Sequence, residues 1–122
     1  MISFSACRQV AEPAAAATPA LDPNSPEGRG AALFSGSGRC ATCHSLTSDT
    51  VIVGPSLAGI ATRAATRVSG LTAAEYLEES IVRPDAFKSP GFDDVQMDAS
   101  LAKSLSVDQV ADLVAFLMTL NE

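Results

Sequence analysis

Two cysteines and the single histidine of the chain lie together in the run Cys40-Ala41-Thr42-Cys43-His44. Each of two thiols at this spacing can add across one vinyl group of a haem, and a histidine directly after the second thiol lies where its imidazole can reach the iron. A Cys-x-x-Cys-His run is typical of c-type haem attachment. We therefore expect Cys40 and Cys43 to hold one haem c covalently and His44 to bind its iron.

Two other uses of this motif make demands that the rest of the sequence does not meet. A structural zinc site needs a second pair of cysteine or histidine ligands, and the remaining cysteine is the distant Cys7. A thioredoxin-like redox pair expects a preceding strand in a βαβ unit, whereas residues 35–38 are a Ser-Gly-Ser-Gly turn. The sequence therefore favours haem attachment.

An iron with a ligand on each face needs a second group besides His44, and the chain offers methionine, lysine, tyrosine or its N-terminus. Methionine is the leading candidate. Met1 lies at the chain end, and Met118 has the position of a core residue on the last expected helix. Met97 is alone in a loop expected over residues 84–99, and such long loops usually have a function. We predict Met97 as the second ligand, with an ordinary surface residue as the alternative.

Helices can be predicted from capping residues and apolar spacing. Ser25 as N-cap and Pro26 in the first helical position predict a helix that ends near residue 35. Thr72 and Ser106 are each followed three residues later by Glu or Gln, the capping-box pattern, so helices are expected after both. A short helix is expected over residues 60–67. The fold class is therefore predicted to be all-α, with three to five helices around one haem.

The composition of the chain restricts the partners it can bind and the size of the core that its side chains can form. The formal net charge of the 122 residues is −6, which argues against nucleic acid as a partner. The chain has 5 Phe, 1 Tyr and no Trp, so a buried haem would supply apolar surface that the side chains do not. No stretch approaches the roughly 18 apolar residues of a transmembrane helix.

Residues 1–26 differ in composition from residues 27–122, and we treat them as an N-terminal segment that precedes one domain. Residues 8–26 contain four prolines and four consecutive alanines, so an extended tether is expected. The small residues just before Cys7 resemble the end of a bacterial lipoprotein signal, although six residues cannot hold a complete secretory signal. Two interpretations stay open, a lipid anchor on Cys7 or an unmodified thiol in a disordered terminus.

The motif and four further stretches resemble class I cytochromes c over nearly all of Pro26 to Leu120. The further stretches are Gly30 to Phe34, Gly54 to Gly59, Tyr76 to Pro84 and Ala111 to Leu120. The resemblance implies the class I cytochrome c fold with one haem per chain. It is closest to single-haem domains fused to or associated with bacterial membrane respiratory complexes, including haem-copper oxidases and alternative complex III.

The resemblance also implies contacts between specific residues. In that family the proline of the Gly-Pro turn offers its carbonyl to the ring N–H of the haem histidine, which implies a contact between Pro55 and His44. Such a bond would fix the imidazole tautomer and raise its basicity. The first and last helices are expected to cross at Gly30 and Phe116.

Two arginines follow the Gly-Pro turn, Arg63 and Arg67, where cationic groups could meet the haem propionates. Solvated helix charges are the equal alternative for both. Two positions depart from the family pattern. Asp98 follows Met97 where proline is usual, and Arg83 occupies a position where asparagine is frequent.

The resemblance implies a one-electron carrier and not an enzyme. Its expected partner is a membrane respiratory or photosynthetic electron-transport complex, and its expected location is periplasmic, tethered to the membrane. Asp93, Asp94 and Asp98 are expected to rim the exposed haem edge and to meet a basic partner surface. One alternative is a haem sensor or peroxidase-like protein in which Met97 does not bind the iron, and another is a haem-bearing subunit that only docks.

Overall fold

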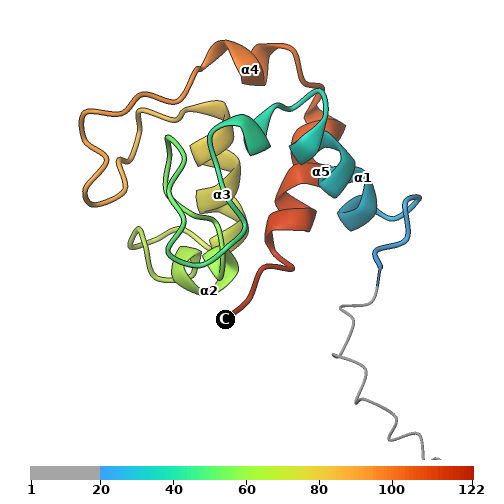
Figure 1. Ribbon diagram of the computed structural model, residues 1–122, viewed down its shortest axis with the longest axis horizontal. Coiled ribbons are helices and arrows are strands. Elements are labelled where there is room, and N and C mark those ends of the chain that lie inside the picture. Colours follow the sequence, from blue (N-terminus) through green and yellow to red (C-terminus); the bar gives the residue numbers. More distant parts are fainter. Residues whose placement is uncertain (1–19) are drawn as a thin grey trace, which may run out of the picture.

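The computed structural model describes residues 20–122, so the lipid-anchor site predicted at Cys7 and most of the predicted tether lie outside the described residues. The elements are α1 (Pro26–Ser35), the 3-10 turn η1 (Cys40–Thr42), α2 (Ile60–Ala64), α3 (Ala73–Val82), α4 (Ser100–Lys103) and α5 (Val107–Leu117). Residues 20–122 contain no strand, which confirms the predicted all-α class. Helix α5 lies between α1 and α3 (Figure 1). Among the described residues, no helix has the length and apolar character needed to cross a membrane.

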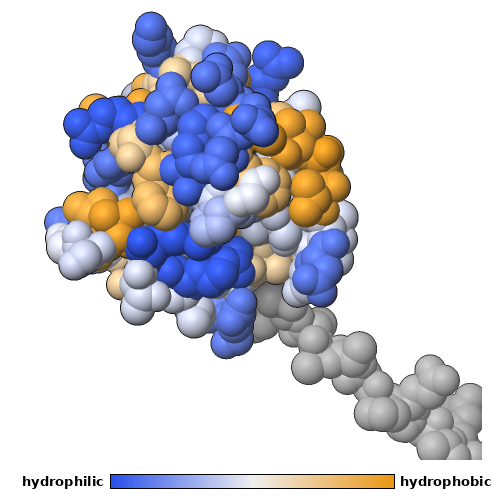
Figure 2. Space-filling view, turned by 90° about the vertical axis from the view of Figure 1, so that its left-hand side faces the viewer, coloured by the Kyte–Doolittle hydropathy of each residue, from blue (hydrophilic) through white to orange (hydrophobic). Residues whose placement is uncertain are grey.

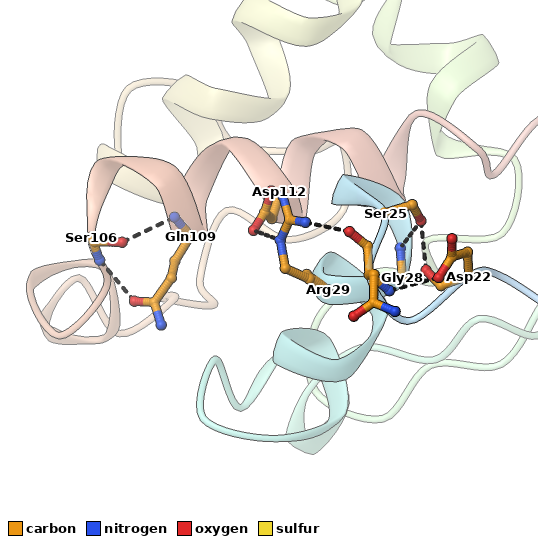
Figure 3. Close-up of polar contacts among 8 residues, drawn as sticks. Asp22, Ser25, Gly28, Arg29, Ser106, Gln109 and Asp112 are labelled. Atoms are coloured by element: carbon orange, nitrogen blue, oxygen red, sulfur yellow. Dashed lines mark hydrogen bonds and ion pairs between the residues drawn. The ribbon is translucent and has the colours of Figure 1, made fainter.

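Helix α1 begins where the sequence predicts. The Ser25 hydroxyl accepts a hydrogen bond from the backbone N–H of Gly28 at 3.0 Å and donates one to the Asp22 carbonyl oxygen at 2.6 Å (Figure 3). Pro26 occupies the first helical position, where an N–H would have no partner inside the helix. The incoming chain is therefore anchored to the first turn.

Helices α3 and α5 each begin with a capping box, as predicted. The Thr72 hydroxyl accepts from the Glu75 N–H at 3.2 Å, and the Glu75 carboxylate accepts from the Thr72 N–H at 2.7 Å. Ser106 and Gln109 repeat the arrangement at 3.1 Å and 2.9 Å (Figure 3). Both boxes satisfy N–H groups that a helix start leaves without partners.

Helices α1 and α5 cross at Gly30 and Phe116, which confirms that prediction. A Cβ atom added to Gly30 would overlap the Asp112 carbonyl oxygen and lie 2.7 Å from Phe116 Cβ. The Phe34 and Phe116 rings then pack edge to face, with centroids 5.6 Å apart and planes inclined by 61°. The missing side chain at Gly30 therefore permits the close approach of the two helices.

An ion pair spans the same crossing (Figure 3). Arg29 Nε and Nη2 donate to the two carboxylate oxygens of Asp112 at 2.9 Å and 3.0 Å, and Nη1 donates to the Asn24 carbonyl oxygen at 2.6 Å. The Arg29 side chain is 49% exposed, so solvent screens the pair and its contribution to stability is small.

The hydrophobic core is shared by α1, α2, α3 and α5. Its buried apolar residues are Phe34, Ile60, Ala61, Ala64, Tyr76, Leu77, Ile81, Val110, Leu113, Phe116 and Leu117. Leu113, Leu117 and Tyr76 also line the large cavity described below. The core and the cavity therefore share a wall, and whatever fills the cavity completes the core.

Two helices differ from the sequence-based expectation. Helix α2 ends at Ala64 rather than near Arg67, because the next N–H groups, of Thr66 and Arg67, bond three residues back and tighten the chain into turns. Helix α4 was not expected. It follows Asp98, whose carboxylate accepts from the Ser100 N–H at 2.9 Å and starts the turn.

The expectation that Met118 is a core residue is wrong. Its side chain is 37% exposed, and the residue is the C-cap of α5. Leu113 and Leu117 occupy the core-facing positions of that helix. The next residue after Leu117 points about 100° further round the helix axis, away from the core.

Candidate functional site

The Cys-x-x-Cys-His run forms one tight turn. The backbone N–H groups of Cys43 and His44 both donate to the Cys40 carbonyl oxygen, at 3.1 Å and 2.9 Å. The residue before the run, Arg39, has a φ of 57°, a left-handed conformation that few side chains adopt without cost. These features turn both cysteines and the histidine toward the same cavity, whose wall they form.

A second set of backbone bonds fixes the following loop to this turn. The N–H groups of Val53 and Gly54 donate to the Cys43 carbonyl oxygen at 3.1 Å and 2.9 Å, and the Leu57 N–H donates to the Ser45 carbonyl oxygen at 2.8 Å. The Gly-Pro turn is thereby held directly against the Cys-x-x-Cys-His turn.

The imidazole of His44 is oriented by this turn. Its Nδ1 lies 2.8 Å from the Pro55 carbonyl oxygen, the contact that the family resemblance implies. A carbonyl oxygen only accepts, so Nδ1 carries the proton and donates, which leaves Nε2 as the ring nitrogen able to bind a metal. A Cβ atom at Gly54 would lie 2.6 Å from His44 Cε1, so glycine is needed for the ring to fit.

One cavity of about 610 Å³ joins the predicted site residues. This volume lies within the roughly 300–1,000 Å³ of typical cofactor pockets. Cys40, Cys43, His44, Pro55, Arg63, Arg67 and Met97 all line it. Met118 is absent from its wall, so of Met97 and Met118 the cavity brings only Met97 together with His44.

The loop over residues 84–99 lines the cavity with residues that the sequence analysis had not assigned to a site. Phe87, Lys88, Phe92 and Val95 lie on the wall beside Met97, which is half-buried. Phe87 packs edge to face on Tyr76 of α3, with ring centroids 5.8 Å apart. Tyr76, Leu77, Ser80 and Ile81 of α3 line the same cavity.

Arg63 is held by the loop that precedes it. Its Nη2 donates to the Ser56 carbonyl oxygen at 3.0 Å, its Nη1 donates to the Ala58 carbonyl oxygen, and Nη1 also lies 3.2 Å from Glu122 Oε1. The guanidinium therefore ties the Gly-Pro loop to α2, a role that sequence reasoning missed. Contact with a haem propionate stays a prediction for this residue.

Arg67, unlike Arg63, has a side-chain donor without a hydrogen-bond partner among the described residues. This donor is the buried Nε, and the Arg67 guanidinium carbon lies 6.0 Å from the Phe87 ring centroid. A buried donor without a partner costs roughly 1–3 kcal/mol. An anionic group in the cavity would remove that cost, and a haem carries two propionates.

Two titratable groups on the wall have shifted pKa values. Burial raises the pKa of the Cys40 thiol, with a smaller contribution from Cys43. Hydrogen bonds from the Ser100 side chain and backbone lower the pKa of Asp98, and the nearby Arg39 charge adds to that shift. The Asp98 carboxylate is therefore ionised at neutral pH.

The residues present fit a haem. The wall is mostly apolar, it carries two thiols at the vinyl-attachment spacing, and it offers an oriented imidazole, a thioether and an unsatisfied cationic donor. A bare metal ion has no comparable site, since residues 20–122 hold no group of three or more His, Cys, Asp or Glu side chains arranged as ligands.

Comparison with known protein families agrees with this donor set. The family model described as cytochrome c matches residues 28–121. The matched range contains both the Cys-x-x-Cys-His run and the loop that carries Met97. A comparison with curated proteins gave no match.

Proposed function

The chain belongs to the cytochrome c family, whose members are haem-based electron-transfer proteins, and from this premise we propose a one-electron carrier with His44 and Met97 as its two iron ligands. Cys40 and Cys43 would attach one haem c covalently. The observation that carries the proposal is the single cavity lined by both cysteines, the histidine and Met97.

The bound haem would supply an iron that changes its oxidation state by one electron. The chain's own residues then have three tasks. Pro55 holds the His44 ring through Nδ1, which increases the basicity of Nε2. Apolar side chains of α3 and α5 exclude water, and Arg67 Nε offers a donor to a propionate. Ligation by His44 and Met97 would raise the reduction potential of the haem relative to ligation by two histidines, and would leave no site on the iron for an outside ligand.

The test is replacement of Met97 by alanine in the haem-loaded protein. Loss of the thioether should abolish the long-wavelength sulfur-to-iron absorption band of the oxidised protein, lower the reduction potential and let the reduced protein bind CO. Met118→Leu is the matched control, because Met118 lies outside the cavity, and it should change none of these.

The behaviour of the unsubstituted protein tests the alternative, a sensor or peroxidase-like protein. Such a protein would lack the sulfur-to-iron band before any substitution and would bind CO rapidly when reduced. A protein that ligates through Met118 would respond to the Met118 variant and not to the Met97 variant.

We place the carrier on the periplasmic side of a membrane, as a partner of a respiratory or photosynthetic complex. The support for this is the family membership and the predicted tether with a lipid anchor at Cys7. A native N-terminal peptide carrying lipid on Cys7, detected by mass spectrometry, would establish the anchor, and an unmodified peptide from Met1 through Arg8 would exclude it.

The proposed partner surface lies on the loop that carries Met97. Asp93, Asp94 and Asp98 are all exposed, and Asp98 lies on the cavity wall. Val51 and Val53 also line the cavity, and they form an exposed apolar stretch with Ile52. Hydrophilic and apolar patches alternate on the face drawn in Figure 2. Acidic and exposed apolar residues around one cavity suit a partner that offers both basic residues and an apolar contact.

A further inference from the structure

The loop that carries Met97 lacks the restraints that regular secondary structure and burial give to a helix. Residues 84–99 contain no helix or strand, and none of these residues is buried. A thioether on a freely moving loop would compete poorly with outside ligands, because every binding event would have to order the chain. The loop therefore needs restraints of another kind.

One restraint is Lys88, which bridges the loop internally. Its Nζ donates to the Val95 carbonyl oxygen at 2.9 Å and lies 3.3 Å from Asp85 Oδ1. The side chain is only 27% exposed although it carries a charge. Between the bridged residues the chain makes two successive turns, from Ser89 to Phe92 and from Phe92 to Val95. The bridge closes this stretch two residues before Met97.

A second restraint follows Met97 directly. Asp98 Oδ1 accepts from the Ser100 N–H at 2.9 Å and from the Ser100 hydroxyl at 2.6 Å. The Asp98 carbonyl oxygen also accepts from the Leu101 N–H at 3.2 Å, which starts α4. The chain after Met97 is therefore fixed by the same carboxylate that begins the next helix.

We infer that Lys88 and Asp98 are positioning residues that hold the Met97 thioether at the cavity from the two sides of the loop. The inference depends on the proposed ligation by Met97. Neither side chain touches the iron in this scheme. Each acts by restricting the backbone next to Met97, which raises the effective concentration of the thioether at the iron relative to any dissolved ligand.

The experiment measures imidazole binding to the oxidised, haem-loaded protein, because imidazole must displace Met97 to bind. Lys88→Leu removes the donor without adding a second thioether that could itself bind the iron. A hydrogen bond from a charged donor is stronger than one between neutral groups, so imidazole affinity should rise about tenfold. The sulfur-to-iron band should weaken at a lower imidazole concentration.

Matched variants separate positioning from charge and from general destabilisation. Lys103→Leu removes the same charge from an exposed lysine of α4 and should leave imidazole affinity unchanged. Lys88→Arg keeps a cationic donor and should restore most of the wild-type affinity. Asp85→Asn removes the ion pair but keeps the bond to Val95, so its effect should be small.

The second restraint is tested in the same way. Asp98→Ala loses both bonds to Ser100 and should raise imidazole affinity severalfold, whereas Asp98→Asn keeps an acceptor oxygen and should resemble the wild type. In both variants, the free energy of unfolding, measured by denaturation followed by circular dichroism of the helices, should change less than the free energy of imidazole binding.

Unchanged imidazole affinity in both Lys88→Leu and Asp98→Ala would overturn the inference while leaving the proposed function intact. An equal increase in Lys103→Leu would also overturn it, because charge alone would then explain the effect. If the wild type shows no sulfur-to-iron band, Met97 is not a ligand, and the proposed ligation and this inference fail together.

Discussion

The ring nitrogen Nδ1 of His44 lies 2.8 Å from the carbonyl oxygen of Pro55, eleven residues further along the chain. The histidine belongs to the haem-attachment turn, and the proline belongs to the Gly-Pro turn that backbone bonds hold against it. The contact fixes the tautomer that leaves Nε2 able to bind iron. The backbone of the Gly-Pro turn thus sets the orientation of the ring.

Covalent attachment is the first prediction. The intact mass of the mature protein should exceed that of the polypeptide by one haem, and acidified acetone should fail to extract it. Replacing Cys40 and Cys43 together by alanine should give an unfolded or degraded apoprotein, because the cavity shares its wall with the core. A well-folded double variant without haem would show that the cofactor is not needed to complete the core.

Gly30→Ala is predicted to destabilise the protein despite the higher helix propensity of alanine. The added Cβ would overlap the Asp112 carbonyl oxygen and crowd Phe116, so α1 and α5 must separate. Overpacking of this kind costs about 1–3 kcal/mol in the free energy of unfolding. Denaturant unfolding of the haem-loaded protein measures the loss.

The matched substitution is Ala32→Gly on the exposed side of the same helix. Its cost should be about 1 kcal/mol, from propensity alone. A stabilised Gly30→Ala variant would mean that the crossing is looser than the distances indicate.

Glu75 should make the stability of α3 depend on pH. Hydrogen bonds from the Thr72 backbone and side chain lower its pKa from 4.5. A carboxylate with a lowered folded pKa contributes stability above its unfolded pKa, and that contribution is lost as the pH falls through the folded value. Glu75→Ala should therefore be less stable than the wild type near pH 7, with the difference shrinking below about pH 4.5.

Gln109 provides the control for this pH effect, because it fills the same position of the second capping box without a charge. The stability difference between the wild type and Gln109→Ala, measured by circular dichroism during denaturation, should stay constant across the same pH range. A pH-dependent difference for Gln109→Ala would assign the effect to another group.

Replacing Asp93 and Asp94 by asparagine should slow electron transfer to a basic redox partner at low salt and leave the absorption spectrum unchanged. Both carboxylates are exposed. The difference between variant and wild type should vanish as salt rises, because the Debye length falls to about 8 Å near 0.15 M. Stopped-flow kinetics over a salt series measure this. Equal rates at every ionic strength would place the partner surface elsewhere.

The helix starts and the haem-attachment turn could be predicted from the sequence because their causes are local. Ser25, Thr72 and Ser106 each bond an N–H group three residues away, so the capping residue and its partner are visible in one short stretch. The crossing of α1 and α5 at Gly30 has no such local signal, and it was predicted from the family resemblance instead. The helix expected after Ser106 was likewise predicted correctly, although Met118 is exposed and not in the core.

The tertiary structure decided which distant residues meet. Arg63 follows the Gly-Pro turn in sequence, but only the folded loop shows that its guanidinium is occupied by two carbonyl oxygens and Glu122. Lys88 had no motif to mark it, because its partner is a backbone carbonyl that any residue could provide. Sequence patterns report side-chain chemistry and short-range bonds, whereas a contact with a backbone oxygen across a loop depends on the folded conformation of the whole chain.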